Sequence, residues 1–175
     1  FMILSGIHFA LLFSIVSGNY RNLLKSTILR YYIFMLVFGV IVTTFSTFGD
    51  VFKDWIVSLR YSAFQIISIG TSTGFATTDT SIWPSLAQVL LIFFTLQCAC
   101  AGSTSGGIKV DRIVILGKVF IKQIRQIEHP NAIIPIRING ENVPTKTVDM
   151  GVAYIVVYLT VVFLATVSLT ALGVD

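Results

Sequence analysis

A short polar stretch decides the fold of this chain, and it reads Ser68-Ile69-Gly70-Thr71-Ser72-Thr73-Gly74-Phe75-Ala76-Thr77-Thr78-Asp79. The segments on either side are apolar and long enough to be helices, whereas this stretch is rich in hydroxyls and is divided by glycines. A soluble loop does not need such apolar flanks, and an ordinary membrane helix does not tolerate so many hydroxyls at one end. We therefore interpret the stretch as the lining of a pore, and the rest of the chain as its scaffold.

The composition is that of a membrane protein. Hydrophobic residues make up 55% of the 175 residues and charged residues 11%, and the mean hydropathy is +0.87. These values depart from globular proportions, and the length leaves room for several spans of about 20 residues. The net charge of +4 comes from basic residues in short segments between apolar runs, as in cytoplasmic loops, so nucleic acid is not an expected partner. Cys98 and Cys100 are expected to be buried small hydrophobes.

Apolar runs predict helical segments at 1–16, 31–48, 55–69, 85–101, 108–124 and 150–172. We expect the first to be the inner end of a helix that starts before Phe1, and the last to be a complete span. Residues 55–69 mix polar side chains with apolar ones at helical spacing, so we interpret them as a short re-entrant helix. The partial negative charge at the C-terminal end of that helix would favour a cation.

A second polar segment interrupts the helix that follows. Gly102-Ser103-Thr104-Ser105-Gly106-Gly107 falls at the depth where residues 85–101 should be completing their span. Non-helical backbone at membrane depth is tolerated only where it is buried in protein or lines a watery cavity. We therefore expect this segment to face the same pore as the first.

The order helix, re-entrant helix, polar loop and helix is complete once, so we predict an all-α membrane fold cut from a tandem repeat as a partial chain. Basic residues around Arg21 and over 118–146 place these two regions in the cytoplasm. Within the second region, Asn139-Gly140 between short alternating runs predicts a β-hairpin. The domains expected are 1–30, the end of a preceding repeat; 31–127, the complete repeat; 128–147, a cytoplasmic loop; and 148–175, the first helix of the next repeat.

Two other functions are open on the residues alone. Gly70-Thr71-Ser72-Thr73-Gly74 matches the nucleophile elbow G-x-S-x-G, so an intramembrane serine hydrolase using Ser72 is the alternative. Its histidine would have to be His8 or His129, and both are predicted to lie across the membrane from Ser72. A membrane scaffold without conduction is a third possibility. Residues 102–109 resemble a phosphate loop, but Ile108 stands where that motif needs lysine.

A cation filter fits the opening stretch better. A dehydrated ion needs a ring of oxygens, which successive backbone carbonyls can supply. Gly74 can take dihedral angles that a residue with a Cβ resists. Phe75 would anchor the segment in the wall behind, and Asp79 would either raise the local cation concentration or act as a loop acid or helix cap. Hydroxyls that can support or join the ring belong to Thr71, Ser72 and Thr73.

Three motifs carry a family resemblance: residues 68–79, the run Cys100-Ala101-Gly102-Ser103-Thr104-Ser105-Gly106-Gly107-Ile108-Lys109-Val110, and the run His129-Pro130-Asn131-Ala132-Ile133-Ile134-Pro135. Together they resemble the third repeat of the pore subunit of the Trk potassium-uptake systems, in the Trk/Ktr/HKT superfamily. The resemblance implies four unequal helix, pore-helix, helix repeats, similar to those of potassium channels, around one potassium pathway. Each repeat would give one filter segment with a key glycine.

The resemblance also implies a filter and a gate. The filter segment would be Thr71, Ser72, Thr73, Gly74, Phe75 and Ala76, with Gly74 as the key glycine and K⁺ at Thr71, Ser72, Thr73 and Gly74. Ala76 replaces the second glycine of the channel sequence TVGYG, which indicates a looser filter. The gating loop would be Gly102, Ser103, Thr104, Ser105, Gly106 and Gly107. Lys109 would help to hold the pore closed, or would snorkel to the inner interface. Asp111 would pair with a basic neighbour or be a local variation.

Potassium transport in a bacterial inner membrane is the implied function, with K⁺ as the transported ion, no covalent cofactor and no enzyme activity. The implied partners are the remaining repeats of the full-length chain, a second copy in a homodimer, a cytoplasmic nucleotide-binding regulatory subunit and membrane lipid. Residues 118–146 would form part of the regulatory contact, although anionic lipid is another use for their charge.

Overall fold

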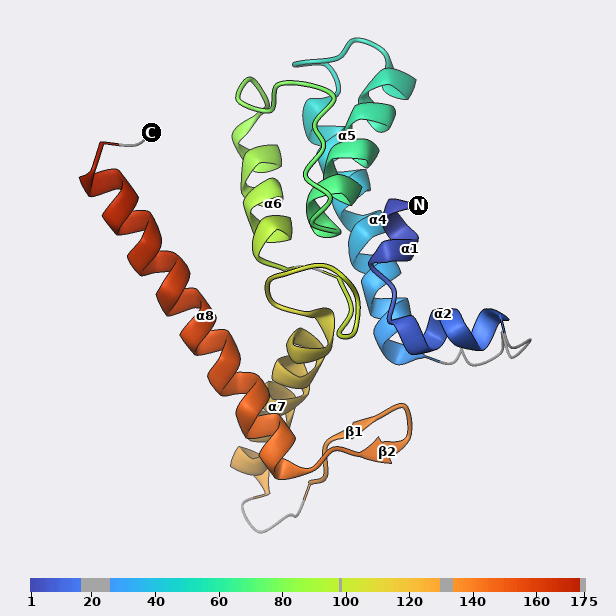
Figure 1. Cartoon of the computed structure of the whole chain (residues 1–175), viewed down its shortest axis with the longest axis vertical. Helices are drawn as coiled ribbons and strands as arrows, with labels where there is room; N and C mark the ends of the chain where they lie inside the picture. Colours follow the sequence, from blue (N-terminus) through green and yellow to red (C-terminus); the bar gives the residue numbers. More distant parts are fainter. Residues whose placement is uncertain (17–25, 98, 130–133, 174–175) are drawn as a thin grey trace. The chain divides into compact units, whose positions relative to one another are not determined.

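The computed structural model describes residues 1–16, 26–97, 99–129 and 134–173, and it divides into two compact units, 1–111 and 112–175 (Figure 1). This division follows packing and not repeats, so the predicted domain boundaries stay predictions. The expectations for Arg21, for Cys98 and for the middle of the 129–135 motif lie outside the described residues.

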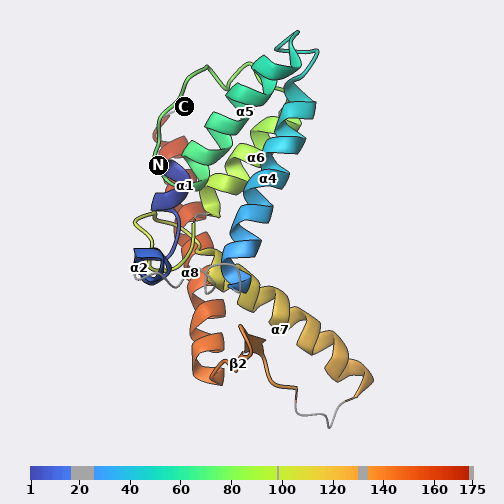
Figure 2. The same cartoon turned by 90° about the vertical axis from the view of Figure 1, so that its right-hand side faces the viewer.

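The first unit is helical. Its helices are α1 (Met2–Ser5), α2 (Phe9–Val16), α4 (Thr27–Thr47), α5 (Trp55–Gly70) and α6 (Ser85–Leu96). Helices α4, α5 and α6 pack side by side (Figures 1 and 2). The second unit contains all but the first two residues of α7 (Val110–Glu128), a hairpin of β1 (Arg137–Ile138) and β2 (Glu141–Asn142), and α8 (Thr145–Ala171).

The predicted helical regions are present, and they differ from the prediction at three places. Residues 1–16 were expected to be one helix, which is wrong, because the chain breaks at Gly6 between α1 and α2. The break frees backbone groups for other partners, since the amide of Cys100 donates to the Gly6 carbonyl at 3.0 Å. The second span ends at Leu96 and not at residue 101, so the interruption is longer than predicted. Helix α8 starts at Thr145, earlier than the predicted residue 150.

One face of α4 forms the centre of the first unit. Its buried residues recur at helical spacing, and they are Leu29, Tyr32, Leu36, Gly39, Thr43, Thr44 and Thr47. Gly39 lets α6 approach closely, because a Cβ at this position would lie 2.4 Å from Cε2 of Phe94. Small residues commonly allow such close approach of helices in membrane proteins.

Hydroxyl groups join α4 to α5. Thr47 Oγ1 lies 2.8 Å from Ser58 Oγ and 3.1 Å from Ser62 Oγ, and Ser58 Oγ donates to the Thr44 carbonyl at 3.0 Å. All four residues are fully buried. The hydroxyls of Thr47, Ser58 and Ser62 thus bond one another inside the packed helices, which explains why α5 carries serines that a lipid-facing helix would avoid.

The long helices have the length and composition of membrane spans. Among the described residues, α4 and α8 are long and apolar enough to cross a membrane, and α6 is a shorter apolar helix. Apolar side chains of α8 such as Val156 and Phe163 are largely exposed. Lipid, or protein outside this chain, is the environment that such a surface requires.

The predicted hairpin is confirmed. Asn139 and Gly140 both have positive φ, 53° and 87°, as a two-residue type I′ turn requires. Arg137 pairs with Asn142, and Ile138 pairs with Glu141.

Candidate functional site

The C-terminal end of α5 holds the predicted filter segment through the backbone. The helix ends at Gly70, and its last carbonyls accept hydrogen bonds from the residues that follow. The amide of Thr73 donates to the Ser68 carbonyl at 2.8 Å, and the amide of Ser72 donates to the Ile69 carbonyl at 2.9 Å. The segment therefore turns back onto the end of its own helix.

This turn aims backbone oxygens away from α5. A trans peptide places its N–H and its C=O on opposite sides, and no described peptide bond is cis. Since the amides of Ser72, Thr73 and Gly74 point at carbonyls near the end of α5, the carbonyls of Thr71, Ser72 and Thr73 point outward. Consecutive carbonyls facing one direction are the arrangement that can replace the water around a cation.

Side-chain hydrogen bonds brace the same segment. Thr71 Oγ1 donates to the Ile67 carbonyl at 2.7 Å and lies 2.7 Å from Thr73 Oγ1, so the buried Thr71 hydroxyl braces the segment against α5. Ser68 Oγ donates to the Phe75 carbonyl at 2.6 Å. Phe75 is 69% exposed in this chain, so its carbonyl is held while the anchoring of its ring in a wall stays a prediction.

Gly74 has the conformation expected of a filter glycine. Its φ is +79°, in a region that favours glycine, and a Cβ there would meet no atom of this chain within 4 Å. The requirement for glycine therefore comes from the backbone angle and not from crowding. Ala76 is exposed.

Asp79 closes a turn outside the filter. Its Oδ1 accepts a hydrogen bond from the Ser81 amide at 2.9 Å, and this bond lowers the pKa of the exposed carboxyl. The side chain is therefore ionised at neutral pH, and the predicted role as a loop acid is confirmed. Its effect on the local cation concentration remains a proposal.

The second polar segment is a closed loop with adjoining ends. The amide of Ile108 donates to the Leu96 carbonyl at 3.0 Å, and the amide of Val110 donates to the Ala99 carbonyl at 3.2 Å. Gly102 and Gly107 have φ values of +70° and +76°. The loop leaves the helical path and returns to it, as in a compact Ω-loop.

Two residues near the N-terminus hold the loop from one side. The amide of Phe9 donates to the Gly102 carbonyl at 3.1 Å, and a Cβ on Gly102 would lie 2.8 Å from Nε2 of His8. The sequence interpretation used His8 only to weigh a hydrolase and missed this contact. A histidine within an apolar run was the available signal, since ionisable residues in such runs are rarely incidental.

Charged side chains hold the other end of the loop. Lys109 is half-buried, and its Nζ donates to the Ser105 carbonyl, so it points into the loop and does not snorkel. The Asp111 carboxylate accepts from the Ala101 amide, a partner that neither prediction for this residue named. Arg112 instead places its guanidinium 3.6 Å from the ring centroid of Tyr154.

Both polar segments border one hollow of the first unit. Its volume is about 630 Å³, and its lining includes Thr73 and Phe75 from the filter segment and Thr104 from the loop. Most of the remaining lining is apolar and comes from α1, α2 and Phe64 of α5. Both segments thus face one hollow, and the prediction that this hollow belongs to a pore stays a prediction.

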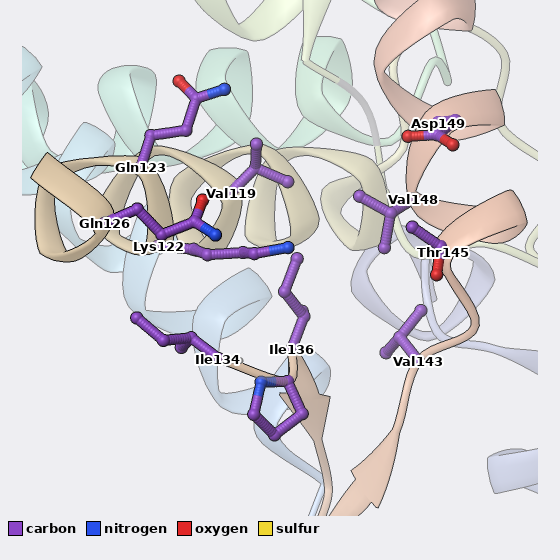
Figure 3. Close-up of a pocket in the computed structure, with 11 residues that line it drawn as sticks. Val119, Lys122, Gln123, Gln126, Ile134, Ile136, Val143, Thr145, Val148 and Asp149 are labelled. Carbon is purple, nitrogen blue, oxygen red and sulfur yellow. The ribbon is translucent and has the colours of Figure 1, made fainter. Parts of the chain in front are cut away.

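The second unit has a pocket of its own, shown in Figure 3. It has a volume of about 410 Å³ and lies between α7, residues 134–136 and the start of α8. Lys122 extends across it beside Ile136, and Asp149 lies on the α8 side (Figure 3). The pocket thus belongs to the predicted basic region and not to the filter.

The hydrolase alternative lacks its structural context. Ser72 has a φ of 55°, as a strained elbow would, but it follows the helix α5 where the motif needs a strand. His8, the candidate base in the same unit, packs against Gly102 of the loop.

A re-entrant helix that carries a glycine-centred segment, followed by a helix interrupted by a loop at the same hollow, defines a pore-loop membrane protein. The sequence profile of the TrkH family, described as cation transport proteins, matches residues 1–173. The chain therefore belongs to the TrkH family.

Known TrkH proteins are similar to this chain over its whole length. The Trk system potassium uptake protein TrkH of Escherichia coli K12 is 31% identical over 179 residues, which cover 100% of this chain and 37% of that protein. TrkH of Salmonella typhimurium is 30% identical, with the same two coverages. The crystal structure of the potassium transporter TrkH from Vibrio parahaemolyticus matches with a TM-score of 0.90 at 30% identity, over 99% of this chain and 38% of that one. The chain thus spans little more than a third of the length of these relatives.

Proposed function

We propose that this chain forms one part of the ion pathway of a potassium transporter. The observation that carries the proposal is the outward direction of the Thr71, Ser72 and Thr73 carbonyls, fixed by the amides that bind the end of α5. We infer that the ion is K⁺ because the TrkH relatives are named as potassium uptake proteins and as a potassium transporter.

One filter segment reaches an ion from one side. Potassium coordination needs oxygens from several directions, so the other sides would come from further repeats of the same kind. The C-terminal end of α5 lies directly behind the segment, and its partial negative charge favours a cation there. These features support a K⁺ site at Thr71, Ser72, Thr73 and Gly74.

The substitution Gly74→Ser tests the filter in the protein that carries this chain, expressed at full length. A serine at a φ of +79° is strained, so the carbonyls on either side should rotate and the preference for K⁺ over Na⁺ should fall. Competitive uptake of the two ions measures it. Gly117→Ser is a matched control, because Gly117 has open space around it and lies in α7. An unaltered preference in the Gly74 variant would contradict the proposal.

The loop of residues 102–107 serves as the gate in this proposal, with Lys109 holding it closed. Lys109 follows the loop in the sequence, and its Nζ donates to the Ser105 carbonyl within the loop. This contact supports that role. Lys109→Ala should therefore raise basal ion flux. Unchanged basal flux would count against it.

The basic part of the second unit would contact a cytoplasmic nucleotide-binding regulatory subunit, and the whole protein would work as a homodimer in a bacterial inner membrane. Lys118, Lys122 and Arg125 share one shallow pocket with residues 134–137, and their charge supports an acidic partner surface. Lys122→Glu should weaken co-purification of the subunit. Weaker binding to anionic vesicles, with co-purification intact, would assign the charge to lipid.

A further inference from the structure

The gating loop surrounds the end of the Lys109 side chain with oxygen atoms. Nζ of Lys109 lies 3.4 Å from the Ser103 carbonyl, 3.4 Å from Ser103 Oγ and 3.4 Å from Ser105 Oγ, and it also donates to the Ser105 carbonyl. We call these four oxygens the loop cage. They come from two residues of one loop, and Ser105 is buried.

The hydroxyl protons of the cage point elsewhere. Ser103 Oγ donates its only proton to the Cys100 carbonyl at 2.6 Å. Ser103 Oγ and Ser105 Oγ lie 2.9 Å apart, so the proton in that bond must come from Ser105. Both hydroxyls, like both carbonyls, therefore present lone pairs to Lys109.

Such a set of acceptors has the chemistry of a cation site. Hard cations without directional bonding are held by carbonyl and hydroxyl oxygens that replace their water. An ammonium group is a compact cation that can occupy the same kind of site. Ordinary solvated lysines do not gather four acceptors from one loop, because holding a long side chain in one geometry costs entropy.

We propose that the loop cage is a binding site for a monovalent metal cation, which the Lys109 ammonium occupies in the closed loop. A K⁺ or Na⁺ ion and the ammonium then exclude each other, because two like charges cannot share four oxygens. A cation that enters the cage displaces Lys109 and removes the contact that closes the loop. The proposal rests on the proposed function only for the arrival of the ion. The cage itself is inferred from the contacts of the Lys109 Nζ with its four oxygens.

Rubidium scattering in the full-length protein tests the cage. Rb⁺ substitutes for K⁺, and its anomalous signal reports where it binds in crystals. Lys109→Met removes the ammonium and keeps an unbranched side chain, so Rb⁺ should appear in the cage of the variant and be absent from the cage of the native protein. Rb⁺ at Thr71–Gly74 is read in the same crystals and tests the filter separately.

Each outcome of the Rb⁺ experiment either supports or contradicts the cage. No Rb⁺ in the cage of the Lys109 variant, with Rb⁺ present at the filter, would overturn the cage and leave the proposed function standing. Rb⁺ in the cage of the variant, with no Rb⁺ at the filter, would support the cage and contradict the proposed function. Equal Rb⁺ in the cages of the native and variant proteins would refute competition with Lys109.

Lys118→Met is the matched control, because within the described part of the chain the Lys118 Nζ donates to one backbone carbonyl, that of Arg137. Rb⁺ at the former position of the Lys118 Nζ in this variant would show that any site vacated by a lysine takes the ion. That result would contradict a specific cation site in the cage. If Lys109→Met does not yield folded protein, Lys109→Gln carries the same experiment. Rb⁺ should then also raise the unfolding temperature of the variant more than that of the native protein, and an equal rise would contradict the proposal.

Discussion

Ser68 Oγ donates a 2.6 Å hydrogen bond to the carbonyl of Phe75, so the last turn of α5 and the far end of the filter segment are joined directly. Ser68 is fully buried, and its own carbonyl accepts from the Thr73 amide. One residue of the helix therefore fixes both the middle and the end of the segment.

Ser68→Ala should loosen the filter. Removal of a buried hydrogen-bond donor costs about 1–3 kcal/mol when it leaves an acceptor without a partner. We expect the K⁺ over Na⁺ preference to fall while the protein still folds, and competitive uptake measures this. Ser168→Ala removes a similar serine-to-carbonyl bond on the exposed surface of α8 and should leave the preference unchanged. Equal preferences in both variants would show that Ser68 does not hold the filter.

Gly39→Ala should destabilise the packing of α4 on α6. The new methyl group would lie 2.4 Å from the Phe94 ring, and Phe94 is only 3% exposed, so the ring has no free space to enter. Overpacking of this kind costs about 1–3 kcal/mol. Thermal unfolding in detergent measures the loss. The double variant Gly39→Ala/Phe94→Leu should recover part of it, and a strictly additive pair would contradict a direct clash.

Asp111→Ala should free the loop at Ala101. The carboxylate accepts the Ala101 amide proton, and hydrogen bonds to charged groups contribute about 1.5–3 kcal/mol. Hydrogen exchange at that amide should become faster, and basal ion flux should rise. Asp111→Asn keeps an acceptor oxygen and should lie between the native protein and the alanine variant. Faster flux without faster exchange would assign Asp111 to some other role.

Asp79→Asn separates the two roles considered for Asp79. Asparagine can still accept the Ser81 amide proton, so the turn should persist while the charge is lost. The apparent affinity for K⁺ should weaken at low ionic strength and approach the native value at high salt. An affinity that is native at every salt concentration would leave Asp79 with the turn alone.

The pH dependence of the Asp79 turn follows from the direction of its pKa shift. The Ser81 amide lowers the pKa of the folded carboxyl. The stabilisation is therefore fully present above the unfolded value of about 3.9 and is lost as the pH falls through the lower folded value. K⁺ uptake should show no titration from Asp79 between about pH 5 and 8, and a transition in that range that Asp79→Asn abolishes would contradict this.

The sequence predicted α5 almost to the residue, because its polar and apolar positions alternate with helical spacing and glycine follows at its end. It also predicted the hairpin, since Asn139-Gly140 favours the two positive φ angles of its turn. These features depend on residues that are close together in the sequence, so they can be predicted from the local sequence alone.

Other features depend on partners far along the chain and could not be predicted in this way. Residues 97–101 are uncharged and continue the helical pattern of the sequence, yet the helix ends at Leu96, whose carbonyl takes the Ile108 amide as its partner. The contact between His8 and Gly102 likewise exists only once the loop has folded back. Lys109 could be singled out by its charge, but its oxygen partners could not.

The adjoining ends of the loop have a mechanical consequence. Because Leu96 and Ile108 are already bonded through their backbones, a movement of the segment between them would not require any change in the distance between these two anchors. The close packing of Gly39 against Phe94 would hold α4 and α6 together during such a movement. If the loop is the gate, as proposed, opening would resemble a latch on a rigid frame and not the spreading of a helical iris, and single substitutions within the latch should tune how often ions pass.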